Sequence, residues 1–227
     1  MNKKSFDDFV IIKNNFFVNP EKILRLYEKQ EFFPAENYPG KRTDNLLESK
    51  DTEVRNFALF FVEKLSKEVF IGIHEFMIDI RFHINSVYVH EDANHGWIHA
   101  DHTDLAGVVY LTENENDFES GTSIFSKNTK ENFTVDDYSS RQQFNLTGVA
   151  TEEYLKDLID NHNTFTESIR VGNRYNRLIA YDSKLFHRPN RYTLLSGNNR
   201  KTIVFFIKGY KVEKLEKIKL NSSWEDS

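Results

Sequence analysis

The first third of the chain carries apolar residues at the spacing of amphipathic helices. Asn19 and Pro20 combine a capping side chain with a proline at the first helical position, which predicts a helix that continues to about residue 30. Its inward-facing residues are Ile23, Leu26 and Tyr27. A second helix is predicted over residues 51–70, where one face carries Val54, Phe57, Phe61, Leu65 and Val69. Both helices are expected to cover one face of a sheet.

From residue 77 onward the pattern changes to short runs of β-branched and aromatic residues. Residues 81–89 alternate between apolar and polar side chains, as a strand does. Further strands are predicted over residues 97–101, 106–111, 122–125, 168–171, 178–181 and 201–207. Short strands separated by turn-rich segments predict a jelly roll or a barrel.

These elements predict one mostly β domain with flanking helices, in the α+β class. Residues 1–75 form the helical layer, residues 76–210 the β core, and residues 211–227 a charged tail. Residues 127–165 are expected to be an insertion between strands: residues 127–149 are polar with scattered aromatics, and Thr151 caps a short helix that ends near residue 161. Such a long connection serves either as a lid or as a plain surface loop, and both alternatives stay open. The segment Pro-Gly-Lys-Arg-Thr at residues 39–43 is interpreted as a turn.

Composition narrows the classes of function. The chain has no cysteine among its 227 residues, which excludes disulfides, thiolate-bound zinc, iron–sulfur clusters and a thiol nucleophile. The net charge of −5 is mild and no basic block occurs, so nucleic acid is not an expected partner. There is no signal peptide and no apolar run that would span a bilayer, so we expect a cytoplasmic protein without a membrane partner. Whether it forms a homodimer is left open.

The candidate chemistry lies in the segment Trp-Ile-His-Ala-Asp-His at residues 97–102. His99 and Asp101 are two residues apart, so on a strand they would project from the same face. A third candidate, His187, occurs much later, in Leu-Phe-His-Arg-Pro. Two histidines and one carboxylate are the facial triad that holds non-haem iron and leaves coordination positions open.

Three His-x-Asp pairs compete for this role. They are His90/Asp92, His99/Asp101 and His102/Asp104. The middle pair is favoured because it ends a short predicted strand and an apolar strand follows it. The first pair precedes a turn and the last falls in a predicted connecting loop, although a part for either in the site stays open.

The run from Tyr88 to Thr112, with Gly121-Thr122, His187 and Arg200-Lys201-Thr202, resembles the Fe(II)/2-oxoglutarate-dependent dioxygenases, and most closely their prolyl-hydroxylase-like branch. The resemblance covers about residues 77–210 and implies a double-stranded β-helix with the N-terminal helices on one sheet. It implies that the iron ligands are His99, Asp101 and His187. It also implies a binding site for 2-oxoglutarate formed by Arg200, Thr202, Tyr110 and Tyr88, in which Arg200 pairs with the C5 carboxylate. Arg188 and Arg191 are the alternatives to Arg200.

The resemblance further implies the cofactor Fe(II), the co-substrate 2-oxoglutarate, and dioxygen. The expected reaction is hydroxylation of an aliphatic C–H bond of a small molecule, amino acid or protein side chain, with conversion of 2-oxoglutarate to succinate. A carboxylate ligand favours hydroxylation because related halogenases lack it. The alternatives are a cupin-like metalloenzyme that does not use 2-oxoglutarate and a non-catalytic jelly-roll binding protein. Substrate contacts are expected from Lys41, Arg42, residues 127–149 and Arg188.

Overall fold

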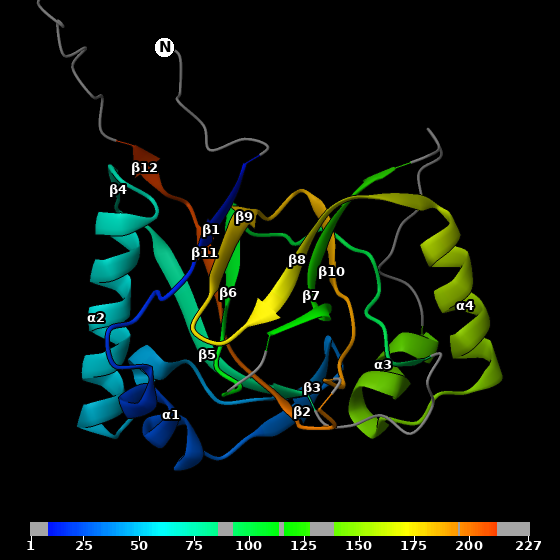
Figure 1. Ribbon diagram of the computed structural model, residues 1–227, viewed down its shortest axis with the longest axis horizontal. Coiled ribbons are helices and arrows are strands. Elements are labelled where there is room, and N and C mark those ends of the chain that lie inside the picture. Colours follow the sequence, from blue (N-terminus) through cyan, green and yellow to red (C-terminus); the bar gives the residue numbers. More distant parts are fainter. Residues whose placement is uncertain (1–8, 86–92, 114–115, 128–138, 195, 213–227) are drawn as a thin grey trace, which may run out of the picture.

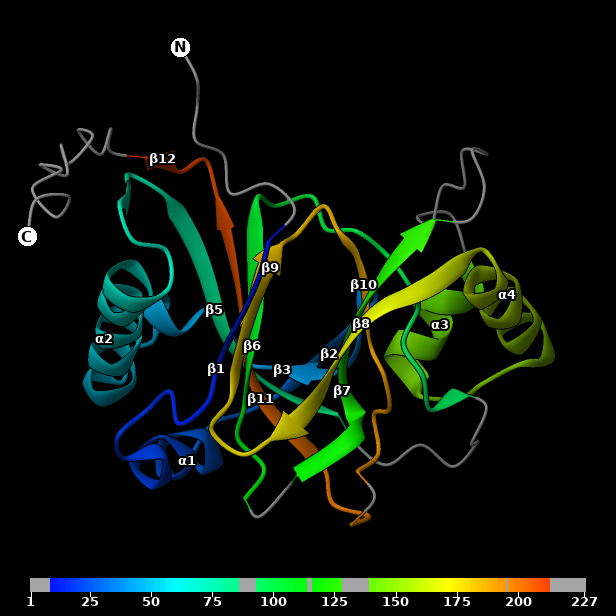
Figure 2. The ribbon, with the colours of Figure 1, turned by 45° about the horizontal axis from the view of Figure 1, so that its top comes forward.

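The computed structural model describes residues 9–85, 93–113, 116–127, 139–194 and 196–212. Its centre is a pair of antiparallel sheets that face each other (Figures 1 and 2). The seven-stranded major sheet has the order β1-β9-β6-β11-β5-β3-β2, and the three-stranded minor sheet has the order β10-β7-β8. This architecture confirms the predicted mostly β class with a jelly-roll core.

The strands of the major sheet are β1 (Val10–Lys13), β2 (Phe33–Ala35), β3 (Tyr38–Arg42), β5 (Met77–Asn85), β6 (Leu105–Tyr110), β9 (Leu178–Asp182) and β11 (Arg200–Lys208). The minor sheet contains β7 (Asn116–Lys127), β8 (Phe165–Arg174) and β10 (Phe186–Pro189). A separate pair joins β4 (Ile73–His74) to β12 (Lys211–Val212).

The major sheet is covered on both faces at its centre, where every residue of β6 is buried. In β6, Leu105 and Val109 pack into the cluster under the helices, whereas Ala106 and Val108 face the minor sheet. Ile124 of β7 completes the cluster between the two sheets. Alternation along one strand therefore supplies two separate cores.

The outer face of the major sheet is covered by α1 (Pro20–Glu28) and α2 (Thr52–Glu68), as expected, and a short 3-10 helix, η1 (Leu46–Glu48), precedes α2 (Figure 1). The inward faces of both helices are buried at the predicted positions. Stacking of the Phe57 ring on Phe82 of β5, with centroids 5.9 Å apart, ties α2 to the sheet. The expected cap at Asn19 is wrong, because its side chain makes no capping hydrogen bond, whereas Asp51 caps α2.

Two helices lie between β7 and β8 in the chain, on the opposite side of the molecule from α1 and α2 (Figure 2). They are α3 (Ser139–Thr147), which was not predicted, and α4 (Glu152–Asn163), whose predicted cap at Thr151 is confirmed. The rings of Phe144 and Tyr154 stack 4.1 Å apart and join Trp97 in a small core. The two helices are therefore packed against the segment that carries His99.

Two predictions of local structure are wrong. Residues 97–101 form no strand and contribute only an isolated bridge at His99, since side chains from α4 occupy part of their backbone. Most of residues 39–43, interpreted as a turn, belongs to β3, which ends at Arg42, and Lys41 and Arg42 pair with β5. Gly40 makes this pairing feasible: it has a φ of 81°, and a Cβ there would lie 2.3 Å from the Ile84 carbonyl oxygen. Among the described helices, none combines the length and the apolar character needed to cross a bilayer.

Candidate metal centre

The structure brings the three predicted metal ligands together. One ligand atom from each of His99, Asp101 and His187 lies within 4.8 Å of the others. His99 Nε2 is 3.7 Å from Asp101 Oδ1, and His187 Nε2 is 3.4 Å from Asp101 Oδ2. Among the described residues, this is the one group of three or more potential ligands that is close enough to hold a metal ion.

The two histidines meet because the chain pairs their backbones. The N–H of His99 donates to the carbonyl of His187 at 3.0 Å, and the N–H of His187 donates back at 2.8 Å. Residues exchanging both bonds in an antiparallel bridge project from the same face, which places the imidazole centroids 4.6 Å apart. Asp101, two residues on, is fixed by its own N–H, which donates to the Ser183 carbonyl at 2.8 Å.

Each imidazole is held with the same nitrogen facing Asp101. His99 Nδ1 lies 2.8 Å from the Trp97 carbonyl oxygen, and His187 Nδ1 lies 2.8 Å from the Leu185 carbonyl oxygen. A carbonyl accepts only, so both Nδ1 atoms carry the hydrogen. The lone pair is therefore on Nε2, as a metal ligand requires.

The electrostatic surroundings favour the protonation states of a metal site. Burial, together with the charge of His187, lowers the pKa of His99 and keeps its imidazole neutral. Burial alone would raise the pKa of Asp101, but the His187, His99 and Arg42 side chains hold it below the ordinary range. Asp101 Oδ2 is buried and has no hydrogen-bond partner among the described residues, and His187 Nε2 lies 3.4 Å from it. Two imidazole Nε2 atoms and one carboxylate are a donor set that fits a ferrous ion.

The triad opens into a cavity of about 720 Å³ between the two sheets. Arg200 also lines this cavity, although only 3% of its surface is exposed. Its Nε donates to the Ser120 carbonyl at 3.1 Å and its Nη1 donates to Asn85 Oδ1 at 3.3 Å. A fixed, buried guanidinium in the cavity of a metal site is suited to binding a carboxylate.

The other residues proposed for 2-oxoglutarate lie near Arg200 where the structure describes them. The Arg200 guanidinium is 5.3 Å from the ring centroid of Tyr110, and the Tyr110 hydroxyl lies 2.8 Å from Thr122 Oγ1. Thr202 is directly opposite Tyr110 in the pairing of β11 with β6 and is fully buried. Tyr88 lies outside the described residues.

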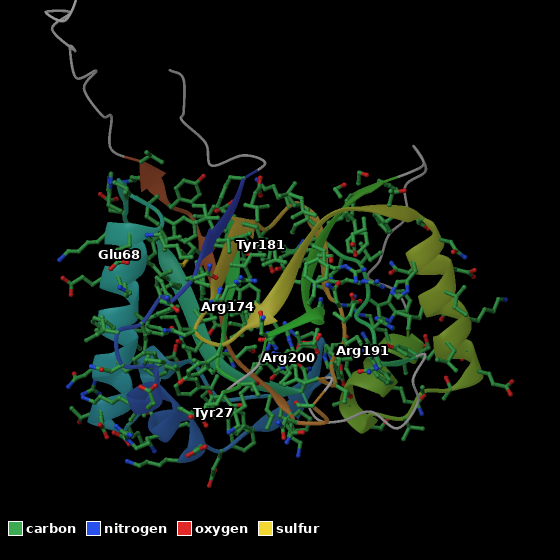
Figure 3. All side chains as sticks on the ribbon, viewed as in Figure 1. Tyr27, Glu68, Arg174, Tyr181, Arg191 and Arg200 are labelled. Carbon is green, nitrogen blue, oxygen red and sulfur yellow. The ribbon has the colours of Figure 1, made fainter. Side chains whose placement is uncertain are left out.

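Of the three arginines considered for the co-substrate, only Arg200 lines the cavity. Arg188 lies beside His162 and over the Phe125 ring. In Figure 3, Arg191 lies nearer to α3, whereas Arg200 lies between the sheets with Tyr181 above it.

The competing His-x-Asp pairs do not join the triad where they are described. His102 is exposed at the cavity mouth. Asp104 accepts a hydrogen bond from the Gly209 N–H at 2.7 Å, which is a structural contact. His90 and Asp92 lie outside the described residues.

The cavity wall contains residues that sequence reasoning missed or placed only loosely. Tyr181 packs against His187, with ring centroids 4.7 Å apart, and its position in an apolar strand gave no signal of this role. Arg42 lines the cavity as expected of a substrate contact, whereas Lys41 and Arg188 do not. From the described part of residues 127–149, the cavity is lined by Arg141, Gln142 and Asn145 of α3. A basic residue beside polar residues on a short helix is a common surface pattern, so nothing in the sequence assigns these three residues to the cavity.

Comparison with known proteins gives a family and a fold. The sequence matches the model of one family, described as "Family of unknown function (DUF6445)", over residues 4–191. None of the curated proteins matches it.

Several solved structures have a similar fold. HygX from Streptomyces hygroscopicus, with nickel, 2-oxoglutarate and hygromycin B bound, is 13% identical, with 91% of this chain and 84% of that chain covered and a TM-score of 0.57. SnoN, a non-heme alpha ketoglutarate dependent epimerase from nogalamycin biosynthesis, is 9% identical, with 88% and 79% covered and a TM-score of 0.53. A Pseudomonas putida prolyl-4-hydroxylase is 12% identical, with 89% and 93% covered and a TM-score of 0.48.

At such identities the similarity shows the fold alone, and it confirms the resemblance to the Fe(II)/2-oxoglutarate-dependent oxygenases at that level. The family model spans most of the chain, and the two sheets enclose the cavity in which the triad lies. The protein therefore belongs to the family of unknown function DUF6445, and its fold is that of the 2-oxoglutarate-dependent oxygenases.

Proposed function

We propose that the protein is an Fe(II)/2-oxoglutarate-dependent oxygenase that hydroxylates an aliphatic C–H bond of an organic substrate. The observation that carries this proposal is the triad, in which two Nε2 lone pairs and a carboxylate face one point inside a cavity that also contains a buried arginine. HygX, with a similar fold, holds a metal ion and 2-oxoglutarate.

The metal would be held by His99, Asp101 and His187, and Arg200 would pair with the C5 carboxylate of 2-oxoglutarate. Bound ferrous iron and 2-oxoglutarate would supply the oxidising chemistry: 2-oxoglutarate would lose CO2 and take one oxygen atom of dioxygen to become succinate, and the other oxygen atom would enter the C–H bond of the substrate. Three protein ligands leave the remaining coordination positions free for these reactants.

The surrounding side chains orient the reactants and exclude water. Arg200 is fixed by Ser120 and Asn85, so its guanidinium is already oriented before 2-oxoglutarate binds. Apolar residues such as Val108 and Val204 line the cavity and would limit the access of water to the triad.

The test is anaerobic titration of the metal-free protein with Fe(II) and then 2-oxoglutarate. We expect metal binding, a visible charge-transfer absorption when 2-oxoglutarate is added, and succinate release in air with a metabolite panel. His99→Ala and His187→Ala should abolish all three, whereas His102→Ala, at the mouth of the same cavity, should retain them. Equal metal binding by all four proteins would refute the proposal.

Substitution of Arg200 separates this function from that of a cupin-like metalloenzyme. Arg200→Gln should weaken 2-oxoglutarate binding by about 10- to 100-fold, the contribution of a charge-assisted contact, while metal affinity stays near that of the wild type. Metal binding without any effect of 2-oxoglutarate would favour the cupin-like alternative. No binding of either would favour a non-catalytic jelly roll.

A further inference from the structure

A second guanidinium, that of Arg42, lines the same cavity. It comes from β3, and its carbon Cζ lies 3.9 Å from the ring centroid of Tyr38 and 5.5 Å from that of Phe206. The Nε atom of Arg42 is buried and has no hydrogen-bond partner among the described residues. The described part of the chain also provides no carboxylate within ion-pair distance of it.

The Arg42 guanidinium faces the triad. Burial lowers the pKa of Arg42 to about 10, while the Tyr38 side chain and the Asp101 carboxylate act in the opposite direction. Arg42 is directly opposite His83 in the pairing of β3 with β5, and His83 is opposite Thr202 in the pairing of β5 with β11. Side chains at paired positions project from the same face of a sheet. Arg42 therefore points into the space between the sheets from the side of the β2–β3 hairpin.

The contacts of Arg42 leave its hydrogen-bonding edge available. A guanidinium that stacks on an aromatic ring uses its flat face, so the N–H groups in its plane remain free to donate. Two adjacent N–H groups match the oxygens of a carboxylate or a phosphate group. Because a buried N–H group without a partner is costly, a ligand anion that accepts from Arg42 Nε would remove an unfavourable feature of the free protein.

The acidic residues around the cavity do not serve as partners of Arg42. Both carboxylate oxygens of Asp79 accept from Arg81 Nε, at 3.0 and 2.9 Å. Glu36 is exposed at the mouth. Asp101 belongs to the triad.

A further positive charge lies on the part of the cavity wall formed by α3. Arg141 of α3 lines the cavity, its Cζ lies 5.8 Å from the Trp97 ring centroid, and its charge contributes to the lowered pKa of His99. With Arg200 assigned to the co-substrate and Asp101 to the metal, the remaining charged residues of the lining are Arg42, Arg141 and Lys208 against Glu36 and Asp79.

We propose that Arg42 binds the carboxylate or phosphate group of the primary substrate, which is a small anionic molecule. This inference rests on the proposed function, since it takes the metal and 2-oxoglutarate to occupy the triad and Arg200. The cavity of about 720 Å³ falls within the range of pockets for metabolite-sized ligands. Arg141 adds to the attraction of an anion from the α3 side.

The test uses wild-type protein loaded with nickel and saturated with 2-oxoglutarate, so the readout does not depend on turnover. Matched pairs of probes are screened by thermal shift and then titrated by calorimetry: 3-phenylpropionate with 3-phenylpropanamide, glucose 6-phosphate with glucose, and further pairs of the same two kinds. We expect an anion to bind at least about tenfold more tightly than its neutral partner, as a charge-assisted fork should give. The acid–amide and phosphate–alcohol pairs distinguish the two anions.

Three variants assign the preference to its residue. Arg42→Gln should lose the preference for anions, Arg42→Lys should keep part of it, and Arg25→Gln, on the exposed face of α1, should keep all of it. Nickel and 2-oxoglutarate titrations of Arg42→Gln verify that the site remains folded.

Three outcomes would overturn the inference: no preference for an anion in the wild type, an undiminished preference in Arg42→Gln, or a loss of 2-oxoglutarate binding in Arg42→Gln but not in Arg200→Gln. If wild-type protein fails to bind nickel and 2-oxoglutarate, the proposed function itself fails. If it binds both but does not discriminate the pairs, only the assignment of Arg42 fails.

Discussion

Asn161, at the C-terminal end of α4, holds the segment that carries His99. Its Oδ1 accepts from the Ile98 N–H at 2.9 Å and its Nδ2 donates to the Ile98 carbonyl at 3.0 Å. This segment is not part of a regular strand pair. The Asn161 side chain therefore makes the hydrogen bonds to the backbone N–H and carbonyl groups that a neighbouring strand would otherwise make. Replacing Asn161 with alanine removes both bonds next to His99, a proposed metal ligand.

The expected cost of Asn161→Ala follows from burial. Asn161 is fully buried and Ile98 is 1% exposed, so the freed N–H and carbonyl of Ile98 would lack partners. Two such losses should lower the free energy of unfolding by about 2–4 kcal/mol. For a chain of this size, that corresponds to a fall of roughly 10 °C in Tm. Loss of a contact that orients a ligand should also weaken metal binding by about 10- to 100-fold.

Asn176 provides a matched control. Its side chain makes the same pair of hydrogen bonds, at 2.9 and 2.8 Å, to the backbone of Phe17 in the helical layer. Asn176 also has a φ of 59°, so alanine there adds strain, and Asn176→Ala should be at least as destabilising. Thermal denaturation of the metal-free proteins and calorimetric nickel titration separate the two effects. If both variants bind nickel alike, or if Asn161→Ala binds as tightly as the wild type, Asn161 does not position the metal ligand.

Three further outcomes are expected. Burial and the charge of Arg188 lower the pKa of His162 to about 4, so this histidine binds a proton more tightly in the unfolded chain than in the folded protein. The free energy of unfolding should therefore fall as the pH drops below about 6.5, by about 2 kcal/mol at pH 5. A His162→Gln variant that is equally acid-sensitive in urea denaturation would contradict this. Gly121→Ala should destabilise β7 by at least about 1–3 kcal/mol, because a Cβ there would lie 1.7 Å from the Val171 carbonyl oxygen, and an unchanged Tm would count against that packing. Tyr110→Phe should fold normally yet bind 2-oxoglutarate several-fold more weakly in calorimetry, whereas equal affinity would remove Tyr110 from that site.

The sequence predicted the elements whose patterns are local. The periodic faces of α1 and α2 and the apolar runs of β6, β9 and β11 all appear close to their predicted ranges. Each of these patterns consists of several apolar residues, so a single residue that departs from the pattern does not change the predicted element. The convergence of the His99 segment with His187 was predicted from the donor types of a facial triad and from the family resemblance, because no local pattern shows which backbones pair.

The elements that were missed depend on contacts distant in the sequence. Pro39-Gly40 is typical of a turn, yet the close approach to Ile84 makes it part of β3 and so brings Arg42 into the cavity. β10 is short and has mixed polarity, and it exists because β7 pairs with it. The role of Asn161 was equally hidden, since an asparagine near a helix end usually serves the helix itself.

The bridge between His99 and His187 is made by main-chain atoms alone. Folding of the backbone therefore supplies the ordering that ion binding must supply in sites assembled around their metal. A triad built in this way is expected to bind and release a metal ion without refolding of the chain.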